Sequence, residues 1–347
     1  MHGESLWIAV DAMGGDHAPG EIVRGAHRAA VEDGARLLLV GDRARLEPEL
    51  ARLGNADGRL ELCHAEEAVG MDEPAITPIR RKRRASVRVC AELVRDGRAR
   101  AMVTAGNTGA AMIAAKMVIG TVPGVDRPAL AAVLPNRRGR TVLLDVGANV
   151  DTKPENLRQF AVMGHFYAQE ILGTAAPRLG LLSIGEEEAK GNDFTREVFR
   201  ALKDSGIHFV GNVEGRDLFT GSVDVIVCDG FVGNALLKAA EAMAELLADM
   251  MREELARSSR TRMGYAMARP AFQAFRERTD YREHGAAPLL GLQGGCFIAH
   301  GRSNARAVQS AVRRAGEFAA ANLDGKIRDK VALLHRAELR LRGEAPA

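Results

Sequence analysis

The feature that most constrains the fold is an alternation of short apolar runs with longer amphipathic segments. Nine runs predict strands, at residues 6–10, 36–40, 60–64, 100–104, 129–134, 141–146, 178–184, 207–211 and 223–228. Segments with apolar residues at three- and four-residue spacing separate most of them and predict helices, as at 21–34 and 154–172. Such alternation is typical of α/β proteins, so we predict a mostly parallel sheet with helices on both faces.

Composition places the chain among globular proteins. Its 347 residues are 46% hydrophobic, and a net charge of +3 does not by itself indicate a nucleic-acid partner. The four cysteines, Cys63, Cys90, Cys228 and Cys296, form no CxxC motif and are expected to be reduced and buried. The first ten residues lack the pattern of a signal peptide, and no run of 18 apolar residues occurs. A cytoplasmic location is expected.

Five predicted strands end in loops of similar polar composition. The loops are VDAMGGDHAP (10–19), AGNTGAAM (105–112), GANVDTKPEN (147–156), GEEEAKGND (185–193) and DGFVGNALLK (229–238). Each combines glycine with asparagine, aspartate or lysine and leads into a predicted helix. The carboxyl ends of parallel strands share one edge of an open sheet, where ligands bind. We therefore expect one polar crevice, with VDAMGGDHAP as one of its walls.

The loop chemistry favours an anionic ligand. Glycine-rich turns that open a helix expose backbone N–H groups beside the positive end of the helix, which suits phosphate. Lys153 and Lys190 add positive charge. Neutral donors come from Asn107, Asn149, Asn192 and Asn234. For a single loop, capping and turning explain the same residues equally well. The set of five favours an anion site.

Other site motifs are missing from the sequence. It contains no GxGxxG, no GxxxxGK[ST], no GxSxG and no HExxH, and no close His/Cys cluster. We therefore expect no cofactor and no metal. His17 and His300 lie in glycine-rich loops, where a catalytic role and a hydrogen-bonding structural role remain open.

Seven segments in order resemble one known family. They are IAVDAMGGDHAP, VTAGNTGAAM, RPALAAVLP, LLDVGANVDTKPENLRQFAVMG, GEEEAKGND, CDGFVGNALLK and LLGLQGGCFIAHG, between about Trp7 and Asn322. Together they closely resemble the bacterial phosphate acyltransferases, which make acyl phosphate from acyl-(acyl carrier protein) and inorganic phosphate for phospholipid synthesis. The resemblance implies a homodimer with a three-layer α/β/α fold, similar to phosphotransacetylases and the isocitrate and isopropylmalate dehydrogenases.

We expect residues 1–347 to form a single catalytic domain. A helical, basic and amphipathic segment at 234–282 is expected to protrude, and 324–347 to form a peripheral tail. The reaction needs phosphate to be oriented and an oxyanion to be stabilised. It needs no strong general acid, because the leaving thiolate has a pKa of about 8.5.

The resemblance also implies roles for the loop residues. Lys190 is the best candidate for a positive group at the phosphate or the oxyanion. Phosphate is expected at Asn107, Thr108 and Gly109, and at Gly147, Ala148 and Asn149. Asp11, Asp16 and His17 line the opening loop and orient phosphate or water, although Asp11 fits a purely structural role equally well. Asn192, Asp229 and Asn234 form a second group of candidates, and Asp145 is expected to orient its neighbours.

Two positions depart from the family pattern. Ala85 replaces one of two serines, so that only Ser86 remains, and Arg302 stands where a small residue is expected. The first change puts any role of the first hydroxyl in doubt. The second alters local anion binding or points to solvent.

Two basic stretches suggest partners. The segment 79–88 holds six basic residues and no acid. The resemblance favours docking of the acidic acyl carrier protein on Arg80, Arg81, Lys82, Arg83 and Arg84. A solvated helix start and nucleic-acid binding or nuclear targeting are the alternatives.

The segment 256–278 carries six arginines and one acid. Apolar residues lie between them: Met263, Tyr265, Met267, Phe272 and Phe275. This pattern suits an anionic membrane surface, close to a membrane glycerol-3-phosphate acyltransferase that would use the product. Helices that contact only a second copy of the chain are the alternative. The preceding apolar stripe at 236–256 is interpreted as core or dimer packing.

Three rival functions are weighed. A phosphotransacetylase-like enzyme would take short acyl-coenzyme A, and the basic patch is the only internal hint against it. An NAD-dependent decarboxylating dehydrogenase of the same fold would need an aspartate metal site and an adenosine pocket, neither of which can be named. A non-catalytic membrane scaffold would have no use for five polar strand ends.

Overall fold

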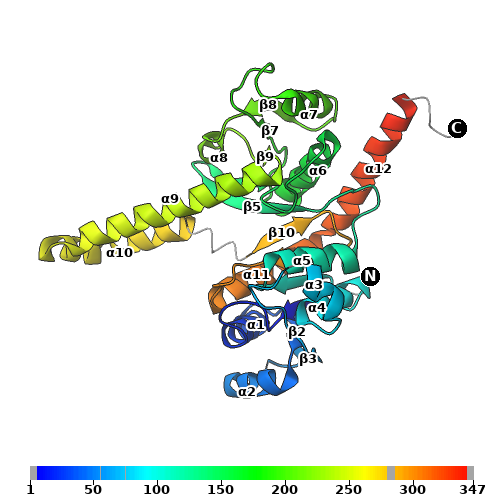
Figure 1. The fold of residues 1–347 in the computed structure, drawn as a ribbon. Coiled ribbons are helices and arrows are strands. Elements are labelled where there is room, and N and C mark those ends of the chain that lie inside the picture. Colours follow the sequence, from blue (N-terminus) through cyan, green and yellow to red (C-terminus); the bar gives the residue numbers. More distant parts are fainter. Residues whose placement is uncertain (1–5, 55, 75, 280–285, 342–347) are drawn as a thin grey trace.

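A computed structural model describes residues 6–54, 56–74, 76–279 and 286–341. Its eleven strands form one sheet in the order β3-β2-β1-β4-β11-β10-β5-β6-β9-β7-β8 (Figure 1). They are β1 (Trp7–Asp11), β2 (Arg36–Gly41), β3 (Leu60–His64), β4 (Ala101–Thr104), β5 (Ala129–Asn136), β6 (Gly139–Leu144), β7 (Leu179–Leu182), β8 (Phe209–Val213), β9 (Val225–Val227), β10 (Ala287–Leu290) and β11 (Gly295–Ile298). All nine predicted strands are confirmed, whereas β10 and β11 were not predicted.

Strand direction divides the sheet into two lobes. The pairs β5–β6, β5–β10 and β10–β11 are antiparallel, and the other pairs are parallel. We call β1–β4 with β11 the first lobe and β6–β9 the second lobe. The two lobes therefore run in opposite directions, with β5 and β10 at their junction. The mostly parallel sheet is confirmed, but the expectation that all five polar strand ends share one edge is wrong.

The register brings the strand ends of the two lobes to one level of the sheet. Thr104 pairs with Ile298, which pairs with Ala287 on β10. Two residues further along β10, Leu289 pairs with Leu130, and the residue after Leu130 pairs with Leu144 at the end of β6. Thus β4 and β6 end within about one residue of the same level but point in opposite directions. A crevice between the lobes follows from this register.

Helices cover both faces of the sheet. They are α1 (Gly20–Glu32), α2 (Arg43–Leu53), α3 (Ile76–Arg81), α4 (Ser86–Arg95), α5 (Thr108–Ala114) with a π-helical turn η1 (Ala115–Ile119), α6 (Pro154–Glu170), α7 (Asp193–Lys203), α8 (Asp217–Thr220), α9 (Gly230–Ala256), α10 (Ser259–Thr279), α11 (Ala305–Ala321) and α12 (Leu323–Leu341). Alternate residues of β1 point to opposite faces. Ile8 and Val10 pack in one buried cluster with α1, α6 and α11, and Ala9 packs in the other with α4 and α5. The three-layer α/β/α fold is confirmed.

The helices α9 and α10 form a hairpin that projects from the body (Figure 1). Only Gly230 and Gly233, in its first turn, are buried on α9. The apolar side chains Met243, Leu247 and Met250 are exposed. Their interpretation as core of this chain is therefore wrong, and packing against a second copy stays a prediction. No helix within the described residues is long and apolar enough to span a membrane.

The C-terminal helix α12 is only partly the peripheral tail that was predicted for 324–347. Leu323, Ile327 and Val331 are buried, and Lys326 forms a 2.5 Å ion pair with Glu170 of α6. Their spacing of four residues places the three apolar side chains on one helix face, which joins the core. Residues 342–347, like 280–282 of the predicted protruding segment, lie outside the described part of the chain.

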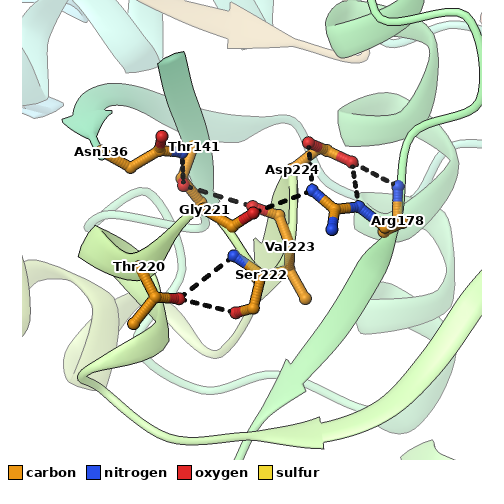
Figure 2. A network of polar contacts seen from close by, with 8 residues as sticks. All are labelled: Asn136, Thr141, Arg178, Thr220, Gly221, Ser222, Val223 and Asp224. Atoms are coloured by element: carbon orange, nitrogen blue, oxygen red, sulfur yellow. Dashed lines mark hydrogen bonds and ion pairs between the residues drawn. The ribbon is translucent and has the colours of Figure 1, made fainter. Parts of the chain in front are cut away.

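A polar network ties the strands of the second lobe together where they begin (Figure 2). Arg178, just before β7, donates from Nε and Nη2 to the carboxylate of Asp224 at 3.0 and 3.1 Å, and from Nη2 to the Gly221 oxygen at 3.0 Å. Beside it, the Thr141 hydroxyl of β6 accepts from Asn136 of β5 at 2.8 Å and donates to the Val223 oxygen, just before β9, at 3.4 Å. These contacts hold β6, β7 and the start of β9 in one arrangement, at the end of the strands away from their polar loops.

Candidate functional site

A cavity of about 1300 Å³ lies where the two lobes meet. Its lining includes Thr108 after β4, Gly147 after β6, Asn234 on α9 and His300 after β11. Polar ends of both lobes, predicted from separate loops, thus come together in one cavity. From there it continues as a groove between α11 and the α9–α10 hairpin, with residues of both along its sides.

The opening loop is built around the buried carboxylate of Asp11, which is 2% exposed. Asp11 accepts hydrogen bonds from the Thr104 hydroxyl at 2.7 Å and from the Met13 N–H at 3.2 Å. Burial raises its pKa, and hydrogen bonds, including one from Ser86, oppose the rise. Asp11 does not line the cavity, so the geometry favours the structural one of its two predicted roles.

This packing explains Gly14, the first of the paired glycines of VDAMGGDHAP. A Cβ atom on Gly14 would lie 2.6 Å from Oδ2 of Asp11 and 2.8 Å from the Gly106 nitrogen. No side chain fits there, because real Cβ contacts are longer. The glycine therefore lets the loops after β1 and β4 approach each other closely, and the site is built on that contact.

Asn107 is fully engaged within the protein. Its Oδ1 accepts from the Ala110 N–H at 3.0 Å and so caps α5. Its Nδ2 donates to the main-chain oxygens of Met71 at 2.8 Å and Glu73 at 3.0 Å. The side chain that was predicted to bind phosphate thus holds two protein segments. The adjacent Thr108 is exposed and lines the cavity, so at this loop it offers the free hydroxyl.

The loop after β6 repeats this design in the second lobe. Asp145 is buried and accepts from the Leu130 N–H at 3.0 Å, the Ala148 N–H at 3.1 Å and the Asn149 N–H at 2.7 Å. Burial raises the pKa of Asp145 in spite of these bonds. Asn149 itself is buried, and its Nδ2 donates to Asp145 and to Pro128. Asp145 thus has the orienting role that was predicted for it.

Gly147, with Val146 before it, reaches the cavity from this loop. Its φ of +124° lies in the region that favours glycine, and a Cβ there would stand 3.5 Å from Asn234. Asp229 and Asn192 instead cap helices: Asp229 accepts from the Val232 N–H at 2.9 Å, and Asn192 from the Thr195 N–H at 2.9 Å. Of the second group of predicted residues, only Asn234 lines the cavity.

Lys190, Asp16 and His17 are exposed and do not line the cavity. Asn212 of β8 fixes the loop of Lys190, because its Nδ2 donates to the Glu187 oxygen at 2.9 Å. The Asp16 N–H donates to the Gly301 oxygen at 2.8 Å, which joins the opening loop to the loop after β11. The structure therefore places these three candidates at the surface, outside the lining of the cavity.

One wall of the cavity was not predicted from the sequence. Of its residues, only His300 was named as a candidate, and Arg302 was named without a definite role. This wall is basic and comes from α1, from the loop before α11 and from α11 itself: Arg28, Arg302, Arg306 and Arg313. The sequence does contain a pattern that predicts this wall, because HGRSN (300–304) follows a strand and precedes a helix as the five other loops do. It was overlooked because β11 itself was not recognised.

The predicted carrier-docking residues do not all behave alike. Lys82 donates to Glu73 at 2.7 Å and to the Ala68 oxygen at 2.9 Å, so its ammonium group is used within the fold. Arg84 pairs with Glu66 at 3.4 Å. Arg80, Arg81 and Arg83 are exposed.

The residues that were predicted to contact a membrane also fall into two groups. Met263 and Met267 are 65% and 81% exposed, and Phe275 is exposed as well. Tyr265 and Phe272 instead line the groove, with ring centroids 5.0 Å apart. Within the described residues, no three His, Cys, Asp or Glu side chains are grouped to hold a metal ion.

Comparisons with known proteins agree on one family. A family described as "Fatty acid synthesis protein" matches residues 6–326. A phosphate acyltransferase of Pelotomaculum thermopropionicum is 52% identical over 324 residues, covering 93% of this chain and 94% of the relative. A phosphate acyltransferase of Nitratidesulfovibrio vulgaris is 50% identical over 315 residues, covering 90% and 91%.

Solved structures show the fold. A phosphotransacetylase from Streptococcus pyogenes has a TM-score of 0.61 at 17% identity, covering 91% of this chain and 95% of that one. A branched-chain phosphotransacylase from Enterococcus faecalis has a TM-score of 0.57 at 14% identity, covering 90% and 99%. At these identities the likeness concerns architecture, and it agrees with the predicted resemblance to phosphotransacetylases.

Proposed function

This chain belongs to the phosphate acyltransferase family, and from that premise we propose that it transfers a long-chain fatty acyl group from acyl carrier protein to inorganic phosphate. One observation carries the proposal. Thr108 of the first lobe and Gly147 and Asn234 of the second lobe line one cavity beside a basic wall. Such a site suits phosphate next to a carbonyl group.

The chemistry follows from these groups. A phosphate oxygen attacks the thioester carbonyl carbon, the new C–O bond forms, and the carbonyl oxygen becomes an oxyanion. The C–S bond then breaks and the carrier's thiolate leaves, without a strong general acid because a thiol has a pKa of about 8.5. The Thr108 hydroxyl, the Asn234 amide and the main chain at Gly147 would orient phosphate and stabilise the oxyanion. Lys190, an exposed residue of the loop after β7, is proposed as the positive group for the phosphate or the oxyanion.

The partners follow from the exposed groups. Arg80, Arg81 and Arg83 would attract the acidic carrier protein by electrostatic steering. Met263 and Met267, on the outward face of α10, would contact an anionic membrane surface or a second copy in a homodimer. Acyl phosphate released there would pass to a membrane glycerol-3-phosphate acyltransferase in phospholipid synthesis. The enzyme would thus be cytoplasmic and peripherally associated with the membrane.

The experiment mixes the purified protein with palmitoyl carrier protein, with and without inorganic phosphate. Acyl phosphate is trapped with hydroxylamine, and the released carrier thiol is assayed in parallel. We expect both products only when protein and phosphate are present. Acetyl-coenzyme A as an equally good donor would favour phosphotransacetylase-like chemistry. No product from any donor by folded protein would refute the proposal.

Variants assign the site within the same assay. Asn234→Ala and Thr108→Val each remove one donor and should lower kcat/KM by up to about 100-fold. Lys190→Ala tests the proposed positive group and should lower kcat/KM for phosphate. Lys116→Ala, on η1 and exposed, is the control and should leave the rate unchanged. If Asn234→Ala and Thr108→Val both keep full activity, the reaction does not take place in this cavity.

A further inference from the structure

The groove beyond the reaction site has apolar side chains along β5 and the hairpin and a row of arginines on its other side. Leu130, Ala132 and Leu134 of β5 line it together with Ile298 of β11. The hairpin contributes Leu237 and Ala242 from α9, and Tyr265 and Phe272 from α10. Charged side chains of the hairpin lie beside them in the lining: Lys238, Glu241, Glu245 and Arg269. The arginines of α1 and α11 stand along the other side. A groove of this kind suits a molecule that is hydrocarbon over most of its length and anionic at one place.

The hairpin presents two different apolar faces. Tyr265, Arg269 and Phe272 follow the i, i+4, i+7 spacing of one helix face, and all three line the groove. Met263 and Met267 are separated by four residues on another face and are among the most exposed apolar side chains. The outward face is sufficient for a membrane or a second copy. The groove-facing pair of aromatic rings therefore needs a different occupant.

We propose that this groove binds the hydrocarbon chain of the acyl group that the enzyme transfers. The proposal rests on the proposed function, because it places the thioester carbonyl beside Thr108, Gly147 and Asn234. From there the chain would run over β5 and beneath Tyr265 and Phe272. Continuity supports this occupant, since one cavity includes both the polar ends of the lobes and the aromatic pair. Charge supports it too, since donor and product both carry phosphate and the facing side is basic.

The groove then acts as a measure of chain length. Each methylene moved from water into it should improve binding of the transition state by about fourfold, until the apolar length is filled. Donors with short chains would react without using the aromatic pair. Specificity for long chains is therefore assigned to residues that lie away from the reacting atoms.

The test compares hexanoyl, decanoyl and palmitoyl carrier proteins as donors. Phe272→Ala and Tyr265→Ala should lower kcat/KM for palmitoyl transfer by about tenfold or more and leave hexanoyl transfer unchanged. Met117→Ala, at an exposed apolar side chain of η1 outside the lining of the groove, is the control and should leave the profile unchanged. Ala242→Trp fills the groove at an exposed position that tolerates a larger side chain. It should abolish the advantage of palmitoyl over hexanoyl donors.

A binding measurement separates this inference from the function itself. A fluorescent long-chain fatty acid should bind the wild type and be displaced by palmitate, and Ala242→Trp should bind it at least tenfold more weakly. If no donor yields acyl phosphate, the proposed function fails while this binding still tests the groove. An unchanged chain-length profile in both Phe272→Ala and Ala242→Trp overturns the inference. The inference is also overturned if these variants keep the chain-length profile of the wild type but lose dimers, measured by light scattering, or lose binding to vesicles. The groove would then be an interface with a second copy or with a membrane.

Discussion

Nδ2 of Asn107 donates a 2.8 Å hydrogen bond to the main-chain oxygen of Met71, 36 residues earlier in the chain. The Oδ1 atom of the same side chain caps α5. One amide therefore couples a helix at the reaction site to the loop 70–73. Lys82 holds the same loop from its other side, through Glu73. The predicted carrier-docking segment and the predicted phosphate loop are thus joined by one short loop.

Asn107→Ala should release the loop 70–73 and destabilise the fold. Loss of the helix cap alone costs about 1 kcal/mol, and the carbonyls of Met71 and Glu73 lose their donor as well. We expect faster amide hydrogen exchange at 70–73, measured by mass spectrometry. Asn192→Ala removes the same kind of helix cap from α7, a 2.9 Å hydrogen bond from the Thr195 N–H, and is the control without an effect on 70–73. Equal exchange at 70–73 in both variants would contradict the coupling.

Lys82→Met should impair catalysis without weakening the encounter with the carrier protein. Its ammonium group is engaged with Glu73 and Ala68, whereas Arg83 is exposed. Arg83→Met should therefore raise KM for the carrier and reduce its dependence on salt, because exposed charges steer association. Steady-state kinetics at low and moderate salt separate the two effects. The prediction fails if Lys82→Met raises KM as Arg83→Met does and leaves kcat intact.

The sequence was sufficient for the strands whose apolar runs stand alone, but not for their directions. Asn136 and Gly139 close a tight hairpin between β5 and β6, and this turn reverses the direction of the second lobe. The segment PNRRGR (135–140) contains the residues of this turn. The alternation of strands and helices along the rest of the chain nevertheless predicted parallel neighbours throughout. β10 and β11 escaped notice because each has four residues, one with a proline and the other beside paired glycines.

Site residues were located better than their roles. The loops at Asn107, Gly147 and Asn234 do reach the junction of the lobes. A sequence pattern places a polar side chain at a strand end, yet it does not reveal which partner that side chain will find. Asn149 was expected to bind phosphate, and for Asp11 a ligand role and a structural role were both open. Both side chains are buried and hydrogen-bonded to main-chain groups, which favours a structural role. Only packing between distant segments decides this.

Asp145 should make stability fall as pH rises through the mildly acidic range. Burial raises its pKa above the ordinary value of 3.8, in spite of its hydrogen bonds. Above that value the unfolded carboxyl loses its proton while the folded one still holds it, so the unfolded state binds fewer protons and the free energy of unfolding declines. Urea unfolding of wild type and Asp145→Asn between pH 4 and 7 measures the difference. The advantage of the wild type over the variant should shrink as pH rises, and a growing advantage would refute the assignment.

Arg178→Lys should destabilise the second lobe, because lysine cannot reproduce the forked contact with Asp224 (Figure 2). The ion pair is only partly buried, so we expect a loss of about 1–2 kcal/mol at neutral pH. Burial alone would raise the pKa of Asp224, but the hydrogen bonds and the charge of Arg178 outweigh it and lower the pKa below 3.8. The contribution of the pair is therefore present above that pH and lost as pH falls through the lowered pKa. Arg216→Lys, in an exposed pair with Glu186, is the control and should cost less than about 0.5 kcal/mol. Urea unfolding at pH 7 and pH 3 checks both variants: equal losses in the two variants, or a loss in Arg178→Lys that grows towards pH 3, would show that the network does not hold the lobe together.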